Sequence, residues 1–294
     1  RGKRLWTAFG HLVAVLLLHK ESVYCLRLVV RPGSSQRQMV TRPGSRGAKE
    51  LFLQGTSVEW GRALQQYSPT VQAIGKSRKK EHELVRWDVW LRKELPKAYK
   101  DKGFLTKDEL QIVMNWKITR GTFRPLMKLL LSNSEEDVTQ ATRLALACLQ
   151  ENSSVEKKIR GSVDALCQLR GIGPATASAV LSPFVPELIP FMADEAIEGA
   201  GLERKYTLGC CCELANLLST KAKELGEEWN AELVGRAMWA RGLSEVHGVD
   251  SPSEAGPEIM SSANRPKPAK RKPGADEAAV STQRKKRASK LAKP

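Results

Sequence analysis

The sequence predicts an all-α fold in the middle of the chain, flanked by disordered tails. Three observations carry this prediction. Apolar residues recur at helical spacing after Glu81, N-cap residues precede these runs, and no convincing strand occurs between Asp101 and Gln150. With 294 residues and 41% apolar content, the chain can bury a core. We therefore expect a poorly ordered segment over residues 1–80, a helical domain over 81–248 and a disordered basic tail over 249–294.

The net charge of +16 lies mainly in the two tails. Residues 1–38 carry +6 and residues 251–294 carry +7, whereas the residues between them carry only +3. A nucleic-acid site in the middle of the chain must therefore be a local basic patch and not a property of the whole domain.

Residues 1–38 join a basic start to an apolar run, Leu12–Leu18, and precede the first methionine, Met39. The run is too short to span a bilayer. Three interpretations stay open: translated upstream sequence or a fragment artefact, a mitochondrial-type presequence, and a signal or anchor segment. Residues 41–80 are rich in Gly, Ser and Arg, which predicts a loose lead-in with one short helix near Val58–Tyr67.

The helical pattern begins at Glu81, where Leu84, Trp87 and Leu91 share one helical face. The next helix starts at a capping box formed by Thr106 and Glu109. Further helices are predicted over Arg124–Leu131 and after Ser134, and the spacing of Trp87, Trp90 and Trp116 is typical of core residues.

Two helices meet at a short glycine-containing turn. Ser162 is the predicted cap of the helix Val163–Leu169, and Pro174 suits the first position of the helix Pro174–Leu181. Between them, Gly171 and Gly173 permit positive φ and leave backbone amides open to a phosphate. Ile172 and Ala177 are expected to pack the two helices together.

The rest of the domain supplies one acidic residue, Asp194, and a last helix capped by Asn230. The consecutive cysteines 210–212 point about 100° apart on a helix and cannot converge on one metal. The four histidines are scattered. We therefore expect no metal site.

The tail beyond Ser251 contains two basic clusters, spaced like a two-part nuclear import signal. Their members are Lys270, Arg271, Lys272, Arg284, Lys285, Lys286 and Arg287. We expect an import receptor as a partner and the nucleus as the location, with mitochondrial or secretory targeting by residues 1–38 as alternatives.

The run LRGIGPATA from Leu169 to Ala177, followed by Asp194, resembles the helix-hairpin-helix and Asp signature of base-excision DNA glycosylases related to endonuclease III, the HhH-GPD superfamily. The resemblance implies a helical DNA-glycosylase-like domain that binds double-stranded DNA, as a monomer and without a membrane. Phosphate would be bound by Gly171, Ile172, Gly173, Ala175 and Thr176. Asp194 would be catalytic, because its carboxylate would stabilise positive charge on the sugar of a flipped nucleotide. Lys117, Arg120 and Arg124 lie where the family places its strand-separating loop and are candidate DNA contacts.

Two departures narrow the chemistry that the resemblance implies. Bifunctional members carry a Schiff-base lysine where this chain has Ala175, which predicts a monofunctional enzyme without lyase activity. No cysteine follows Trp239, so the iron–sulfur cluster of the endonuclease III branch is not expected. A monovalent cation bound by the hairpin is the remaining candidate ligand.

Simpler interpretations of the same residues stay open. Asp194 could act only as an N-cap, the glycines could form a bare helix–helix turn, and the three cations could be a solvated face. A non-catalytic DNA-binding module or a protein-interaction module on the glycosylase scaffold is then the alternative function.

Overall fold

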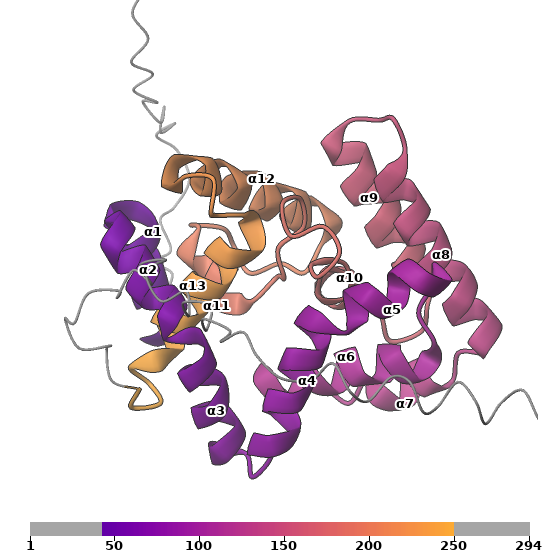
Figure 1. The fold of residues 1–294 in the computed structure, drawn as a ribbon, viewed down its shortest axis with the longest axis horizontal. Helices are drawn as coiled ribbons and strands as arrows, with labels where there is room; N and C mark the ends of the chain where they lie inside the picture. Colours follow the sequence, from indigo (N-terminus) through magenta and orange to yellow (C-terminus); the bar gives the residue numbers. More distant parts are fainter. Residues whose placement is uncertain (1–42, 250–294) are drawn as a thin grey trace, which may run out of the picture. The chain divides into compact units, whose positions relative to one another are not determined.

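The computed structural model describes residues 43–249, and within this range the secondary structure is helical, without strands (Figure 1). The predictions for residues 1–38, and for the two basic clusters between Lys270 and Arg287, lie outside the described residues. The all-α prediction is confirmed for the described part of the chain. The helices are α1 (Pro43–Gln54), α2 (Ser57–Gln65), α3 (Tyr67–Ser77), α4 (Glu81–Lys93), α5 (Leu95–Lys102), α6 (Lys107–Arg120), α7 (Met127–Leu131), α8 (Glu135–Gln150), α9 (Val155–Cys167), α10 (Pro174–Leu181), α11 (Asp194–Gly199), α12 (Leu208–Leu225) and α13 (Ala231–Ser244).

The prediction of a loose segment up to residue 80 is wrong for residues 43–80, which form α1, α2 and α3 and pack on α13 (Figure 1). The short helix expected near Val58–Tyr67 is present as α2. The glycines that suggested a loop serve helix packing. A Cβ on Gly242 would lie 2.2 Å from the Gly44 carbonyl oxygen, so only glycine allows α1 and α13 to approach so closely. Trp60 and Ile74 are buried, and the fold therefore starts well before Glu81.

The capping box predicted at Thr106 and the helix predicted after Ser134 are both confirmed, and Ser134 forms a capping box with Asp137 at the start of α8. The predicted helix from Arg124 is wrong at its start, because α7 begins at Met127 and residues 122–125 are exposed outside any helix. Trp116 is fully buried, as the helical spacing predicts.

The predicted cap at Ser162 is also wrong. The helix α9 begins eight residues earlier, at the cap Ser154, and the Ser162 hydroxyl donates to the Lys158 carbonyl inside the helix. A serine can satisfy its hydroxyl on the preceding turn of a helix, so residue type alone does not mark a start. α8 and α9 lie side by side (Figure 1).

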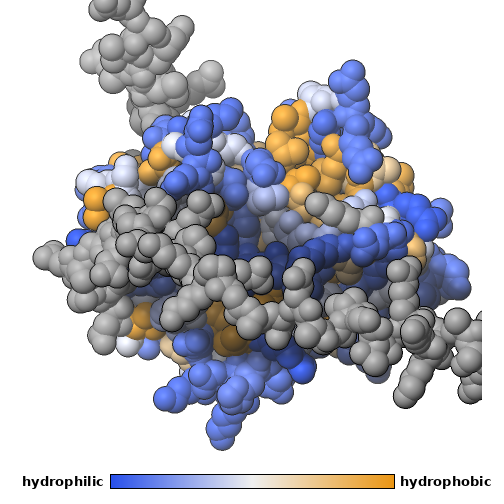
Figure 2. All heavy atoms as spheres, in the orientation of Figure 1, coloured by the Kyte–Doolittle hydropathy of each residue, from blue (hydrophilic) through white to orange (hydrophobic). Residues whose placement is uncertain are grey.

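The face of the described residues that Figure 2 shows is largely hydrophilic, with hydrophobic patches, one of them over α8 and α9. No helix within residues 43–249 is both long enough and apolar enough to cross a membrane. Asn230 caps α13 through a 2.9 Å bond from the Leu233 amide, as predicted.

Candidate functional site

The hairpin joins α9 to α10 through a turn in which the two glycines have different roles. Gly171 adopts φ +80°, and a Cβ there would lie 3.0 Å from the Leu126 carbonyl oxygen. Gly171 is therefore required by the fold itself. A Cβ on Gly173 would meet no atom within 4 Å, so the protein leaves the space above Gly173 open.

The amides of the turn are engaged unequally. The Ile172 amide donates to the Leu169 carbonyl (3.1 Å) and the Thr176 amide to the Gly173 carbonyl (2.8 Å). The amides of Gly173 and Ala175 donate to no acceptor among residues 43–249. Of the five predicted phosphate-binding residues, Gly173 and Ala175 thus offer donors at the start of α10, whereas Ile172 is buried and packs the hairpin as expected.

Asn133 fixes the hairpin from outside, and the sequence reasoning missed it. Its side-chain amide donates to the carbonyls of Leu130 (2.8 Å) and Arg170 (3.0 Å), and its oxygen accepts from the Arg170 amide (2.9 Å). Asn133 is buried, so these three bonds hold α7 and the turn together.

A cavity of about 490 Å³ opens beside the hairpin, a volume typical of ligand sites. Its lining includes Gly173, Ala175 and Thr176 from the hairpin, Asp194 from α11, and the three predicted cations Lys117, Arg120 and Arg124. Gly171 and Ile172 do not line it. The residues predicted separately as phosphate-binding, catalytic and DNA-contacting therefore share one cavity, apart from these two.

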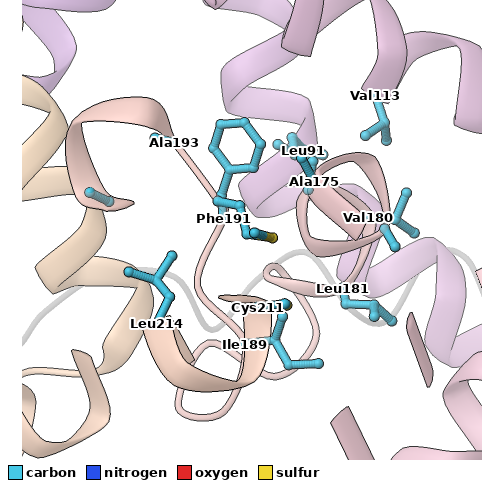
Figure 3. Close-up of a cluster of buried hydrophobic side chains, with 14 of the residues drawn as sticks. Leu91, Val113, Ala175, Val180, Leu181, Ile189, Phe191, Ala193, Cys211 and Leu214 are labelled. Carbon is cyan, nitrogen blue, oxygen red and sulfur yellow. The ribbon is translucent and has the colours of Figure 1, made fainter. Parts of the chain in front are cut away.

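The connection between α10 and α11 forms one wall of this cavity. Phe191 and Ala193 lie on it, and they belong to the same cluster of buried hydrophobic side chains as Ala175 of α10 (Figure 3). The Glu232 carboxylate of α13 accepts a 2.9 Å bond from the Phe191 amide, and the Ser178 hydroxyl accepts one from the Met192 amide (3.0 Å). These bonds fix the chain that delivers Asp194.

Asp194 is the first residue of α11, and its side chain is largely buried. The cap is Ala193, so the interpretation of Asp194 as only an N-cap is wrong. Its carboxylate accepts a hydrogen bond from the Tyr206 hydroxyl and pairs with Arg204 (3.3 Å). Burial, followed by the bond to Asp194, raises the pKa of Tyr206, so its hydroxyl stays a donor. A carboxylate is thus held at the cavity wall.

The three cations differ in depth. Arg124 is exposed in the loop after α6, Lys117 is half-buried in its last turn, and Arg120 is only 3% exposed. Burial and then the charge of Arg124 lower the pKa of Lys117, against the opposing effect of Asp194. The interpretation of these residues as a solvated face is wrong for Arg120.

A buried polar network lies next to Arg120, which lines the cavity. Asp88 accepts bonds from the Tyr67 hydroxyl (2.6 Å) and the Trp116 indole (2.9 Å), and pairs with Arg92 (3.2 Å). Arg92 also pairs with Glu232 at 3.0 Å. The network links α3, α4 and α6 to α13.

Among residues 43–249, no cluster of three or more His, Cys, Asp or Glu side chains could hold a metal ion. Comparison with protein-family models, curated proteins and solved structures finds no match to this chain.

Proposed function

We propose that the chain is a monofunctional DNA N-glycosylase that binds duplex DNA and removes a base with Asp194. One observation carries the proposal: the hairpin, Asp194 and the basic residues, far apart in the sequence, line a single cavity. The open space above Gly173 and the amides of Gly173 and Ala175 suit a DNA phosphate. Lys117 and Arg124 add positive charge beside it.

The chemistry follows from the position of Asp194. A flipped nucleotide that enters the cavity brings its sugar close to the carboxylate. The negative charge stabilises the oxocarbenium-like state as the glycosidic bond breaks, and the carboxylate orients the attacking water. Arg204 and Tyr206 hold the carboxylate without entering the bond-breaking step.

The test is base release from a panel of lesion-bearing duplexes, with wild type compared with Asp194→Asn. We expect one duplex to lose its base in the wild type and not in the variant. Asp164→Asn is the matched control, because Asp164 is an exposed acid on α9. Base loss that is equal in wild type and Asp194→Asn would overturn the proposal.

The absence of lyase chemistry is tested by borohydride trapping. Ala175 offers no amine, and we expect no covalent adduct. Lys117 is an amine in the same cavity. An adduct that disappears in Lys117→Gln would therefore overturn the monofunctional mechanism.

A non-catalytic DNA-binding module is the second candidate. The pairing of Asp194 with Arg204 and Tyr206 favours it, because these contacts also give Asp194 a structural role. Salt-dependent duplex binding that is lost in Gly173→Trp, without base loss from any duplex, is the result expected of this module. We place either activity in the nucleus, through import by the basic clusters between Lys270 and Arg287.

A further inference from the structure

The cavity is lined by one almost fully buried cation without a counter-ion, Arg120. Arg120 forms no ion pair and donates no hydrogen bond within the part of the chain that the structure describes, and its Nε is buried without a partner. Three other buried side-chain atoms lack partners, in Ser153, Arg236 and Ser244, but none of these residues lines the cavity. Arg120 therefore combines an unsatisfied donor with a place in the binding site.

Aromatic rings surround the Arg120 guanidinium. Its central carbon lies 3.8 Å from the ring centroid of Trp239, 5.0 Å from that of Phe191 and 5.1 Å from that of Trp116. Cation–π attraction offsets part of the cost of burial. Rings accept no in-plane hydrogen bond, however, so the N–H groups of the guanidinium remain available to a ligand.

The depth of Arg120 selects against a phosphate as its ligand. A charged phosphate beside Arg120 would also lie close to the Phe191 and Trp239 rings, and the water it would lose there carries a large desolvation cost. The exposed Arg124 meets a phosphate without that cost. A neutral, planar group with acceptor atoms on its edge can enter the cavity and meet the Arg120 donors.

We propose that Arg120 is the specificity-determining residue of the cavity and selects a guanine-type base, whose O6 and N7 accept in-plane hydrogen bonds from the guanidinium. The proposal rests on the proposed function, because a base must be flipped into the cavity. Guanine presents two adjacent acceptors on this edge, which a guanidinium binds in a bidentate manner. Adenine offers a donor beside N7 and fits poorly. Four basic side chains against two acidic ones line the cavity, so cationic alkylated bases are repelled.

The test compares duplexes that differ in one base placed opposite an abasic-site analogue, where flipping is easy. Binding of the full chain is measured by fluorescence anisotropy with guanine, 7-deazaguanine, 7-methylguanine and adenine at that position. 7-Deazaguanine removes only the N7 acceptor, and 7-methylguanine also adds positive charge. We expect guanine to bind on the order of tenfold more tightly than the other three. This comparison uses wild-type protein and does not depend on the folding of any variant.

Two variants locate the preference. Arg120→Lys keeps the charge but loses the bidentate geometry, so the four duplexes should bind almost equally. Arg124→Gln at the cavity mouth should weaken all four by a similar factor and keep their order.

Equal binding of guanine and 7-deazaguanine by the wild type would overturn the inference, as would an unchanged preference in Arg120→Lys. These results would leave Asp194-dependent base release intact. Conversely, a guanine preference that depends on Arg120, without base release from any duplex, would remove the glycosylase proposal and keep the selection of guanine.

Discussion

The Asp88→Asn substitution should destabilise the protein strongly. The asparagine side chain has nearly the same size, but it removes the charge that pairs with Arg92 and cannot accept every bond from Tyr67, Trp116 and Arg92. Because Arg92 is itself largely buried, the change leaves a poorly compensated cation in the core. Breaking such a buried pair costs about 3–5 kcal/mol of unfolding free energy. For a folded body of this size, the melting temperature should fall by about 6–20 °C.

The pH dependence of this loss identifies its cause. Burial alone would raise the pKa of Asp88, but the Arg92 charge and the hydrogen bonds from Tyr67, Arg92 and Trp116 outweigh burial and hold the pKa below its ordinary value. The stabilisation by Asp88 is therefore complete above its unfolded pKa and is lost as the pH falls through the lower folded pKa. Urea unfolding of wild type and variant should differ most at neutral pH and converge in acid.

The exposed Asp164→Asn variant is the control and should unfold like the wild type. A loss below about 1 kcal/mol for Asp88→Asn, the size expected of an exposed pair, would refute the reasoning. A difference between wild type and Asp88→Asn that persists unchanged in acid would refute it as well.

Three further predictions concern the cavity and the hairpin. Lys117→Met should stabilise the fold at neutral pH by about 1 kcal/mol. In urea unfolding, this gain should shrink as the pH rises through the lowered pKa of Lys117 towards 10.5, because the wild type gains stability when its buried lysine loses its charge. Asn133→Ala removes three buried hydrogen bonds and should cost about 3 kcal/mol in thermal unfolding, whereas the neighbouring exposed Ser132→Ala should cost far less. Tyr206→Phe removes a donor to the Asp194 carboxylate and should slow base release about tenfold to a hundredfold in single-turnover assays without a matching loss of DNA affinity; an unchanged rate would remove Tyr206 from the site.

The parts of the fold that local sequence determines could be predicted. The capping boxes at Thr106 and Ser134 and the cap at Asn230 need only residues three positions apart, and all three are present. The hairpin was recognisable for the same reason, since its glycines and Pro174 lie within four residues.

The errors arose where long-range packing decides the structure. The glycine-rich start of α1 resembles a loop in composition, but Gly44 is a contact surface for Gly242, almost 200 residues later in the chain. Similarly, Arg120 has other basic residues as its neighbours in the sequence, and only its tertiary contacts with Trp239 and Phe191 show that it is buried. Neither contact can be recognised from the residues nearby in the sequence.

The residues that hold the candidate site in place could not be predicted from the sequence, for the same physical reason. Asn133 reaches the hairpin across 37 positions, and Glu232 reaches Phe191 across 41. Such contacts depend on how the helices pack, which one sequence does not reveal. Arg204 and Tyr206 are nearer to Asp194, but an irregular segment separates them from α11, so helical periodicity could not place them on the carboxylate.

The energetic character of the cavity separates it from an ordinary packing defect. A void left by imperfect packing would be lined by apolar side chains, whereas this cavity holds a half-buried lysine with a lowered pKa and a buried arginine without a counter-ion. Both reduce stability in the free protein, since each charge has lost water without gaining a full set of partners. The Asp88 network nevertheless holds Trp116, one of the rings beside Arg120, in a fixed position. Donors that lack partners but are held in a fixed position favour binding, because a ligand can then complete their hydrogen bonds without reordering the protein. The Arg120 donors should therefore gain hydrogen-bond partners when a base fills the cavity. The melting temperature of the protein should then rise more with the guanine-containing duplex than with the 7-deazaguanine duplex at equal concentration.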